Sequence, residues 1–373
     1  MISSNMKWKE VLEIKSGKNQ KGVADINGCY PIYGSGGIIG YSKEYLCPAG
    51  TTIIGRKGTI NSPLYVNEPF WNVDTAFGLI PSQQLVSKYL YYFCCYFNFK
   101  ALDKSTTIPS LAKRDLENVE MPVPPLDEQT CIVARIEELF SELDKAVDTL
   151  KTTKEQLAVY RQAVLKDAFL CLPETVEMDK IADMIDPHPS HRTPPEYRNG
   201  IPYIGIGDID YQNKKINFED ARKVSPEVLD EHLHRYTIHK GDFVMGKIGT
   251  IGKPYKIPDE QNYALSANVI LIHPNKEKIC PEFLFWQFSS SLVTKQLTLG
   301  AKATSQPAFG IKKARLLSIK ICELEKQFKI IKRLEAEMSC CDNIEKTVDT
   351  ALAQADAMRQ SILKQAFEEE KEV

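Results

Sequence analysis

Residues 241–247 fit the G-x-x-x-x-G-K pattern of a phosphate-binding loop, which would make the chain a nucleotide-binding protein. That pattern also needs a Ser or Thr at the next position to hold magnesium, and this chain has Ile248 there. The apolar run 243–245 inside the motif is typical of a strand. The sequence therefore argues against a nucleotide site and favours a strand and turn that present Lys247, Thr250 and Lys253.

The catalytic motifs of DNA-modifying enzymes are also incomplete. Residues 193–196 read Thr-Pro-Pro-Glu and lack the carboxamide of the Asn-Pro-Pro-Tyr/Phe element of amino-methyltransferases. The triplet Pro258-Asp259-Glu260 is followed by no Asp/Glu-x-Lys before Glu323, so a metal-dependent nuclease is not favoured. The Gly-x-Gly clusters at 34–37 and 205–207 are weak evidence for a cofactor loop. We expect no catalytic residue in this chain, hence no enzyme.

Cysteine and histidine spacing gives no clear metal or redox motif. The ten cysteines are scattered and never form C-x-x-C, although two vicinal pairs occur, at 94–95 and 340–341. His188 and His191 lie in a proline-rich loop, 187–195. We expect free, mostly packed thiols and neither a bound cofactor nor a metal, with a metal site as the minor alternative.

Positive charge is concentrated away from two acidic segments. The 373-residue chain has a net charge of −2, while 127–170 carries −3 and 323–373 carries −4, so the remainder carries +5. Residues 283–322 contain six cationic side chains and no acid. No run of eighteen apolar residues occurs, so we expect a soluble, cytoplasmic protein with room for two or three domains.

The chain is a tandem duplication. Residues 106–109 align with 304–307, and the offset of 198 persists without a gap to the end of the chain. Upstream, 50–60 aligns with 241–251 and 30–36 with 201–207 across small gaps. Each copy is a globular part followed by a helix. The globular parts alternate short β-branched runs with Gly and Pro turns, which indicates an α+β fold.

The helices carry heptad seams, with apolar residues recurring at alternating steps of four and three. The first seam contains Ile132, Ile136, Leu139, Leu143, Ala146, Leu150, Thr153, Leu157, Tyr160 and Val164. The second contains Ile330, Leu334, Glu337, Cys341, Ile344, Val348, Ala351, Ala355, Met358 and Ile362. Helices of this length span roughly 60 Å, more than a small domain core needs. We therefore expect the two seams to pack on each other, the alternative being that each helix packs on its own domain.

The resulting arrangement resembles the specificity subunits of type I restriction-modification systems. The resemblance rests on residues 30–41, on 56–59 and on the run 108–129, which ends in the prolines and Glu-Gln pair that open the helix. The second copy keeps 246–250 and Gln327 but lacks the prolines at 319–323. The predicted domains are 1–125 and 171–323 for target recognition, with 126–170 and 324–373 as spacer helices.

This resemblance implies a non-catalytic subunit that reads a bipartite target on double-stranded DNA. Two methyltransferase subunits, and through them restriction subunits, would be its partners, and those partners would use S-adenosylmethionine, ATP and magnesium. The helices would pair as an antiparallel coiled coil with pseudo-twofold symmetry, so that the C-terminal helix ends near the N-terminal domain. No membrane association is expected.

Two sets of side chains are the candidates for DNA contact. For the phosphate backbone they are Arg56, Lys57, Thr59, Lys104 and Lys113, then Lys247, Thr250, Lys253, Lys302, Lys312 and Lys313. For the bases they are Tyr33, Ser35, Ser105, Asp208 and Ser305. For each of them, an ordinary solvated surface group is the alternative.

Two other functions stay open at this point. The chain could serve a related system in which methyltransferase and nuclease are one polypeptide, or it could be a coiled-coil scaffold that does not bind DNA. The target sequence, its gap, the methylated base and the presence of a restriction subunit do not follow from these residues.

Overall fold

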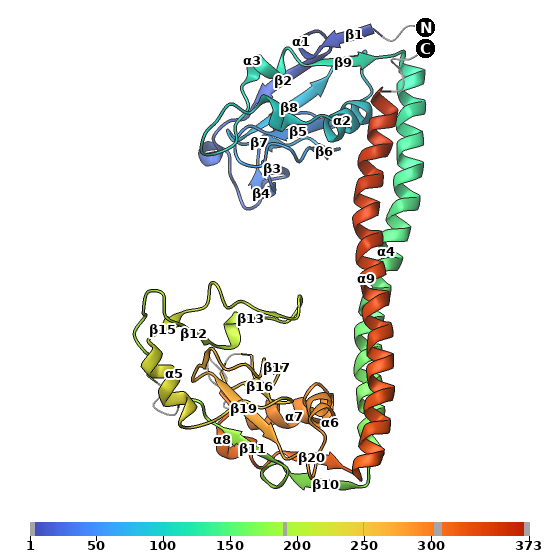
Figure 1. The fold of residues 1–373 in the computed structure, drawn as a ribbon. Helices are drawn as coiled ribbons and strands as arrows, with labels where there is room; N and C mark the ends of the chain where they lie inside the picture. The colour runs from blue at the N-terminus through green and yellow to red at the C-terminus, as the bar shows by residue number, and fades with distance from the viewer. Residues whose placement is uncertain (1–3, 189–191, 249, 302–307, 369–373) are drawn as a thin grey trace. The chain divides into compact units, whose positions relative to one another are not determined.

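The computed structural model describes residues 4–188, 192–248, 250–301 and 308–368 (Figure 1). The chain divides into two compact units, Met1–Thr152 with Val348–Val373, and Thr153–Thr347. We call them unit 1 and unit 2. Each unit combines one globular part with portions of two long helices, α4 (Leu126–Leu170) and α9 (Leu324–Glu368).

Unit 1 is built on short, mostly antiparallel strands. A four-stranded sheet has the order β2 (Leu12–Ser16), β8 (Ala76–Pro81), β5 (Thr51–Gly55), β6 (Leu64–Val66). A three-stranded sheet has the order β4 (Gly37–Ser42), β3 (Tyr30–Gly34), β7 (Trp71–Asn72), with β3 and β7 parallel. β1 (Ser4–Lys7) pairs with β9 (Glu120–Val123) beside the start of α4.

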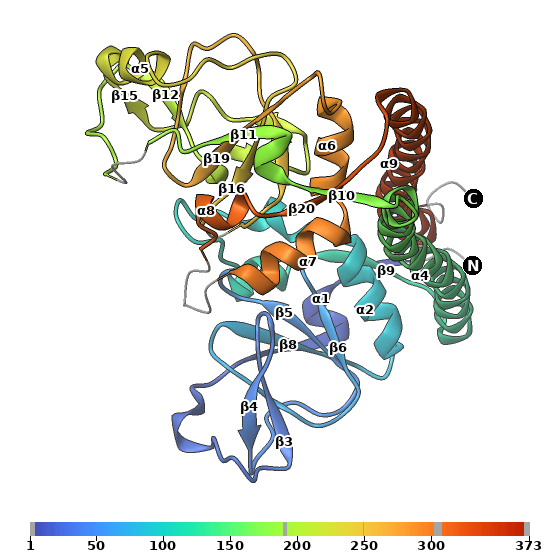
Figure 2. The same ribbon diagram turned by 90° about the horizontal axis from the view of Figure 1, so that it is seen from below.

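Unit 2 repeats this plan strand for strand. Its four-stranded sheet has the order β11 (Ala182–Ile185), β19 (Val269–Pro274), β16 (Phe243–Gly246), β17 (Pro254–Lys256). Figure 2 shows β11, β19 and β16 side by side. The three-stranded sheet is β15 (Lys223–Val224), β12 (Ile201–Ile204), β18 (Ala264–Leu265), and β10 (Glu174–Glu177) pairs with β20 (Ser318–Ile321). Strand β16 confirms the prediction that 243–245 is a strand rather than a phosphate loop.

Short helices cover the sheets. Unit 1 has α1 (Trp8–Val11), α2 (Ser87–Tyr96), α3 (Lys113–Leu116), η1 (Gln20–Gly22) and η2 (Phe99–Leu102). Unit 2 has α5 (Pro226–Leu233), α6 (Pro281–Phe288), α7 (Ser291–Gly300), α8 (Ile311–Ala314), η3 (Met178–Lys180) and η4 (Ile206–Asp208). Unit 2 also adds a hairpin, β13 (Ile209–Asp210) with β14 (Lys215–Ile216). Lys214 in its turn forms an ion pair with Asp342 of α9.

Each globular core is closed by the end of a long helix. In unit 1 the Phe367 ring of α9 packs against the rings of Tyr89 and Phe93, with centroids 5.3 and 5.4 Å away. In unit 2 the Phe169 ring of α4 lies 5.3 Å from Phe283. The two phenylalanines are related by the offset of 198, so each copy of the helix ends in the same way against a different domain. The C-terminal helix does end at the N-terminal domain, as predicted.

The two long helices run antiparallel within each unit and lie side by side (Figure 1). In unit 1, Val133 and Ile136 of α4 share a core with Leu363 and Phe367 of α9. In unit 2 the order is reversed, because late α4 residues share a core with early α9 residues such as Leu334. The predicted packing of the two seams on each other is therefore confirmed.

The buried part of each seam is narrower than predicted, because only one of its two apolar rows is mostly buried. One row of each seam, spaced seven residues apart, is mostly buried. Its buried members are Ile136, Leu143, Leu157 and Val164 in α4, where Leu150 is half-buried, and Leu334, Cys341, Val348 and Ala355 in α9. The other row is more open: Ala146 is exposed, and Tyr160, Ile344 and Met358 are 51%, 41% and 54% exposed. Two helices alone cover only part of each other's apolar face, which leaves the second row in contact with solvent.

An ion pair repeated by the internal symmetry reinforces the helix pair. Arg161 Nη1 lies 2.7 Å from Asp342 Oδ1 in unit 2. Arg359 pairs with Asp144 in unit 1, and both residues are displaced by 198 from the first pair. The duplication therefore preserved a contact between the helices as well as the helices themselves.

A buried glutamine joins each long helix to its globular part. Gln129 accepts a hydrogen bond from Val86 N and donates to the carbonyls of Gln84 and Pro124, each at 2.8 Å. Gln327 accepts from Cys280 N at 2.8 Å and donates to Cys322 O at 2.7 Å. Both side chains are fully buried, and a buried amide is stable only when its hydrogen bonds are made.

Among the described residues, no helix is long and apolar enough to cross a membrane.

Candidate nucleic-acid interface

In unit 1 two loops that are distant in sequence meet. The turn after β5 forms a β-bridge from Lys57 to Ser110, and Gly58 N donates to Pro109 O at 2.9 Å. Leu111 N donates to Arg56 O at 2.9 Å. The structure thus joins the turn containing Arg56, Lys57 and Thr59 to the segment between Lys104 and Lys113. We call this arrangement the paired loops of unit 1.

Unit 2 carries the same pair of loops. Ile248 forms a β-bridge with Ala308, and Phe309 N donates to Lys247 O at 2.9 Å. These partners correspond by alignment to Lys57, Ser110, Leu111 and Arg56. Two predicted contacts, Lys302 and Ser305, lie outside the described residues.

Glycine is required at the start of each turn. A Cβ on Gly55 would lie 2.0 Å from Thr59 O, and one on Gly246 would lie 1.7 Å from Thr250 O. Both are contacts with backbone, which cannot move aside without opening the turn. Gly58 has φ +82°, in the left-handed region that favours glycine. The first glycine of the repeated Gly-x-x-Gly-Thr pattern, Gly55 or Gly246, is therefore required for the close backbone approach found in both units.

A single carboxylate holds the second loop of unit 1. Asp103 Oδ1 accepts from Ser105 Oγ at 2.6 Å and from the backbone N–H groups of Ser105 and Ser110 at 3.0 and 3.1 Å. The Ser105 hydroxyl, then the two N–H groups, hold the pKa of Asp103 below its usual value. Ser105 is exposed, but its hydroxyl shapes the loop. Our sequence reasoning missed Asp103, for which the Asp-x-Ser spacing of a turn was the available signal.

The cations of unit 1 differ in how freely they can reach a phosphate. Lys57 and Thr59 are exposed. Arg56 is half-buried, with its guanidinium carbon 5.7 Å from the Phe77 ring centroid. Lys104 pairs with Asp115 at 2.9 Å, and Lys113 lies 4.0 Å from Glu117. Exposed pairs of this kind contribute little free energy, so their lysines can exchange the carboxylate for a phosphate at small cost.

In unit 2 the burial of Lys247 argues against its predicted contact with the DNA phosphate backbone. Lys247 is 8% exposed, and its ammonium lies 2.6 Å from Asp186 Oδ2, so it serves the interior of the domain rather than presenting a charge to solvent. The neighbouring Thr250 and Lys253 are exposed. The Lys253 ammonium lies 4.0 Å from the Tyr211 ring centroid, a cation–π contact.

Helix α8 supplies two further cations to unit 2. Lys312 and Lys313 are both exposed, and the Lys313 ammonium donates to Gly300 O at 2.8 Å. The predicted cationic set of unit 2 therefore remains available at Lys253, Lys312 and Lys313.

The predicted base-reading residues are engaged in local structure to different degrees. Tyr33 is half-buried with its ring 5.4 Å from Phe70, and burial, then Glu68, raises the pKa of its phenol, so the ring stays neutral. Asp208 Oδ2 accepts from Gly205 N at 2.7 Å and stabilises the turn of η4. Ser35 lies in the turn between β3 and β4.

An exposed apolar strand adjoins Ser35, and our sequence reasoning missed it. Ile38, Ile39 and Tyr41 of β4 are 52%, 54% and 48% exposed. Only alternate residues of a strand share one face, so Ile38 and Ile39 project from opposite faces of this hairpin. The available signal was the run Gly-Gly-Ile-Ile-Gly-Tyr, which lacks the polar alternation of a strand with one solvated face.

Comparison with known proteins agrees with this duplicated plan. The model of the type I restriction modification DNA specificity domain matches residues 3–158 and 173–354. The chain is 24% identical over 345 residues to the type I restriction enzyme EcoBI specificity subunit of Escherichia coli, covering 84% of this chain and 72% of the relative. It is 25% identical over 312 residues to the MjaVIII specificity subunit of Methanocaldococcus jannaschii, covering 77% and 69%.

Two solved structures share the fold. A chain from a study of complex assembly and conformational transition of the type I R-M system has a TM-score of 0.74 at 15% identity, with 98% of this chain and 97% of that chain covered. The HsdS subunit from Thermoanaerobacter tengcongensis has a TM-score of 0.56 at 17% identity, with 98% and 96% covered.

Proposed function

Because the chain belongs to the type I restriction modification DNA specificity family, with two matched domains, we propose that its paired loops form the DNA-facing surface of each unit. The chain is a DNA-recognition specificity subunit and is not itself a catalyst. Its two domains fit a bipartite target, of which each unit would read one half. In this proposal residues 1–125 and 171–323 recognise the target, and 126–170 and 324–373 form the spacer.

The observation that carries the proposal is the recurrence of the paired loops at matching positions. Both units use the same β-bridge, and a glycine at the start of the turn, to bring the turn after β5 or β16 beside a second segment of the chain. Backbone shape is retained in the two copies, while the side chains on it differ. That combination suits two surfaces that contact the same phosphate backbone but different base sequences.

The proposed phosphate contacts are the exposed cations and hydroxyls of these loops and their neighbours. They are Lys57, Thr59, Lys104 and Lys113 in unit 1, and Thr250, Lys253, Lys312 and Lys313 in unit 2. Arg56 is a weaker candidate because it is half-buried. The low net charge of the chain is compatible with DNA binding if partner subunits share the phosphate contacts.

The chain acts with methyltransferase and restriction subunits on DNA. We further propose two methyltransferase subunits, one for each unit, with restriction subunits attached through them. In this proposal the S-adenosylmethionine, ATP and magnesium of the reaction bind to those partners, and the complex works on cytoplasmic DNA.

Salt-dependent DNA binding by the chain assembled with its methyltransferase tests the loop assignment. Lys57→Gln should weaken binding to all DNA sequences and lower the slope of log K against log salt by about 0.9, the value for one lost phosphate contact. Lys88→Gln is the control, since Lys88 pairs with Glu137 of α4 and lies on neither loop. An unchanged slope for Lys57→Gln, Lys104→Gln and Lys113→Gln alike would remove the paired loops of unit 1 from the interface.

Sequencing of methylated DNA tests the division of the target. Replacing residues 173–320 with the corresponding domain of a relative should change one half of the methylated sequence and leave the other half intact. A change in both halves would contradict independent reading by the two units.

A further inference from the structure

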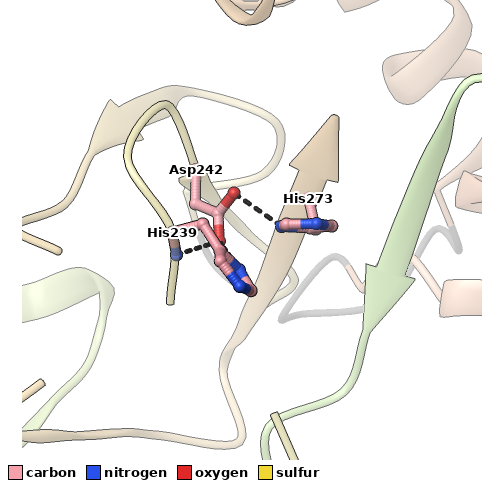
Figure 3. Close-up of side chains that lie close together, drawn as sticks. All are labelled: His239, Asp242 and His273. Carbon is pink, nitrogen blue, oxygen red and sulfur yellow. Dashed lines mark hydrogen bonds and ion pairs between the residues drawn. The ribbon is translucent and has the colours of Figure 1, made fainter. Parts of the chain in front are cut away.

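Two histidines and an aspartate of unit 2 meet where the two inner strands of its four-stranded sheet, β16 and β19, begin and end (Figure 3). His239 and Asp242 belong to the turn that leads into β16, and His273 lies on β19. β16 and β19 are hydrogen-bonded neighbours, with Phe243 opposite Ile272. The sheet register therefore places the turn beside the fifth residue of β19, although the two are about thirty positions apart in sequence.

The donor atoms of the three side chains converge on a small volume. One ligand atom from each residue lies within 4.8 Å of the other two. His273 Nδ1 is 2.8 Å from Asp242 Oδ1, and His239 Nδ1 is 3.9 Å from Asp242 Oδ2. The two imidazole rings have centroids 4.6 Å apart. Asp242 is 1% exposed, and a buried carboxylate needs charge compensation as well as hydrogen bonds.

The turn itself explains only part of this arrangement. Asp242 Oδ2 accepts a hydrogen bond from His239 N at 2.8 Å, which closes the turn. The corresponding turn of unit 1 is closed without a charge, because Thr51 Oγ1 donates to Pro48 O at 2.7 Å. β8 of unit 1 has Ile80 at the fifth position that His273 occupies in β19. A turn of this shape therefore needs neither the carboxylate nor the two imidazoles.

We propose that His239, Asp242 and His273 bind a divalent transition-metal ion of the zinc class. Two imidazole nitrogens and one carboxylate oxygen are donors that zinc and its chemical neighbours accept, whereas magnesium prefers oxygen ligands. In a tetrahedral zinc site the ligand atoms are about 3.3 Å apart, so rotation of the exposed His239 ring and a small shift of His273 bring the three donors to the ion. When His273 Nδ1 binds the ion, the ring carries its proton on Nε2, and the metal–ligand bonds replace the contact between Nδ1 and Asp242 Oδ1.

The site has an open side for a fourth ligand and for entry of the ion. His239 and His273 line a cavity of about 600 Å³ together with Asp183, Asn275 and Glu277. Asp183 is the cross-strand partner of His273 and lies on the same face of the sheet. A water molecule or the Asp183 carboxylate can therefore complete the coordination. The bound ion would link the turn before β16 to the end of β19 and so stabilise this end of the sheet.

The test uses the full chain and measures Zn²⁺ affinity by competition with a chromophoric chelator. The wild-type chain should withhold one equivalent of Zn²⁺ from the chelator, and excess Mg²⁺ should not displace that zinc. His239→Ala and His273→Ala should each weaken that binding roughly tenfold or more. His234→Ala is the matched control, since His234 is an exposed histidine at the end of α5, and its loss should leave the affinity unchanged.

Two further readings distinguish this site from binding by the ten cysteines. The Co²⁺-loaded chain should show visible d–d bands without the intense near-ultraviolet band of a thiolate ligand. Saturating Zn²⁺ should raise the melting temperature of the wild-type chain and not that of the His239→Ala/His273→Ala variant. A thiolate band, or affinity and thermal shift equal in wild type and the double variant, would overturn the proposal whatever the chain does with DNA.

Discussion

The two units share a backbone plan but use corresponding side chains differently. Alignment equates Arg56 of unit 1 with Lys247 of unit 2, and both precede the same β-bridge. Arg56 lies half-exposed over Phe77, whereas Lys247 is buried in an ion pair with Asp186. Both units thus have the hydrogen bonds of the turn, whereas the cation is a surface group in unit 1 and an interior group in unit 2. A side chain's role therefore cannot be transferred from one copy to the other by alignment alone.

The largest effect should come from the feature that the units share most closely. Phe367→Ala in unit 1 and Phe169→Ala in unit 2 each remove a fully buried ring, which should lower the free energy of unfolding by about 3–5 kcal/mol. Chemical denaturation measures both. Val159→Ala, at a side chain that is 71% exposed, is the control. A large loss for only one of the two phenylalanines would break the equivalence of the helix ends.

The next largest effect on stability should differ between the two units, because the turn lysine is buried in unit 2 and exposed in unit 1. Lys247→Ala leaves Asp186 as an unpaired, mostly buried carboxylate and should lower the free energy of unfolding by about 3 kcal/mol. Lys57→Ala, at an exposed position of the unit 1 turn, should change stability by less than about 0.5 kcal/mol. Adding Asp186→Ala to Lys247→Ala should restore part of the lost stability. Equal stability of the two lysine variants would show that Lys247 is not an interior group.

Acid should weaken unit 2 through His232. This ring is fully buried, with its Nδ1 2.9 Å from the Tyr236 hydroxyl and its Nε2 3.1 Å from His188 Nδ1. Burial, then the nearby His188, lowers the pKa of His232 from 6.5 to about 4. The unfolded chain therefore binds the proton more readily, so stability is full above pH 6.5 and falls as pH drops towards 4, by up to about 3 kcal/mol.

Thermal melts between pH 7 and pH 4.5 measure this dependence. His232→Gln should flatten the part of the pH profile between 6.5 and 4.5, while His234→Gln, at an exposed ring, should leave the profile as in wild type. A wild-type slope that persists in His232→Gln would assign the acid sensitivity to other groups.

The smallest effect concerns the symmetric ion pairs of the helices. Arg161 contacts both Asp342 and Glu345, whereas Arg359 contacts Asp144 and lies 5.2 Å from the Phe140 ring centroid. Both are partly exposed, so Arg161→Ala and Arg359→Ala should each cost about 0.5–1 kcal/mol, less at high salt. Double-mutant cycles with Asp342→Ala and Asp144→Ala isolate each pair. A coupling free energy well above this range would mean that the ion pairs, rather than the apolar seam, hold the helices together.

Local pattern was enough for much of the architecture. The repeat at an offset of 198 predicted two units of one plan, and the seven-residue spacing predicted two long helices that pack on each other. The Gly-x-x-Gly-Thr turns and the strand at 243–245 could also be predicted, because glycine backbone freedom and β-branched side chains act over a few neighbouring residues. Those parts depend on the order of residue types along the chain.

Only the tertiary structure decided what individual side chains do. Lys247 is buried because Asp186, sixty-one residues earlier, lies opposite it. The amide of Gln129 is satisfied by backbone groups of a loop more than forty residues away, and His273 reaches Asp242 across a strand pair. The sequence by itself therefore determined the repeat, the helices and the turns, since these follow from local backbone preference and apolar periodicity. Burial, charge pairing and donor convergence depend on which distant segments become neighbours, and that follows only from the packing of the whole chain.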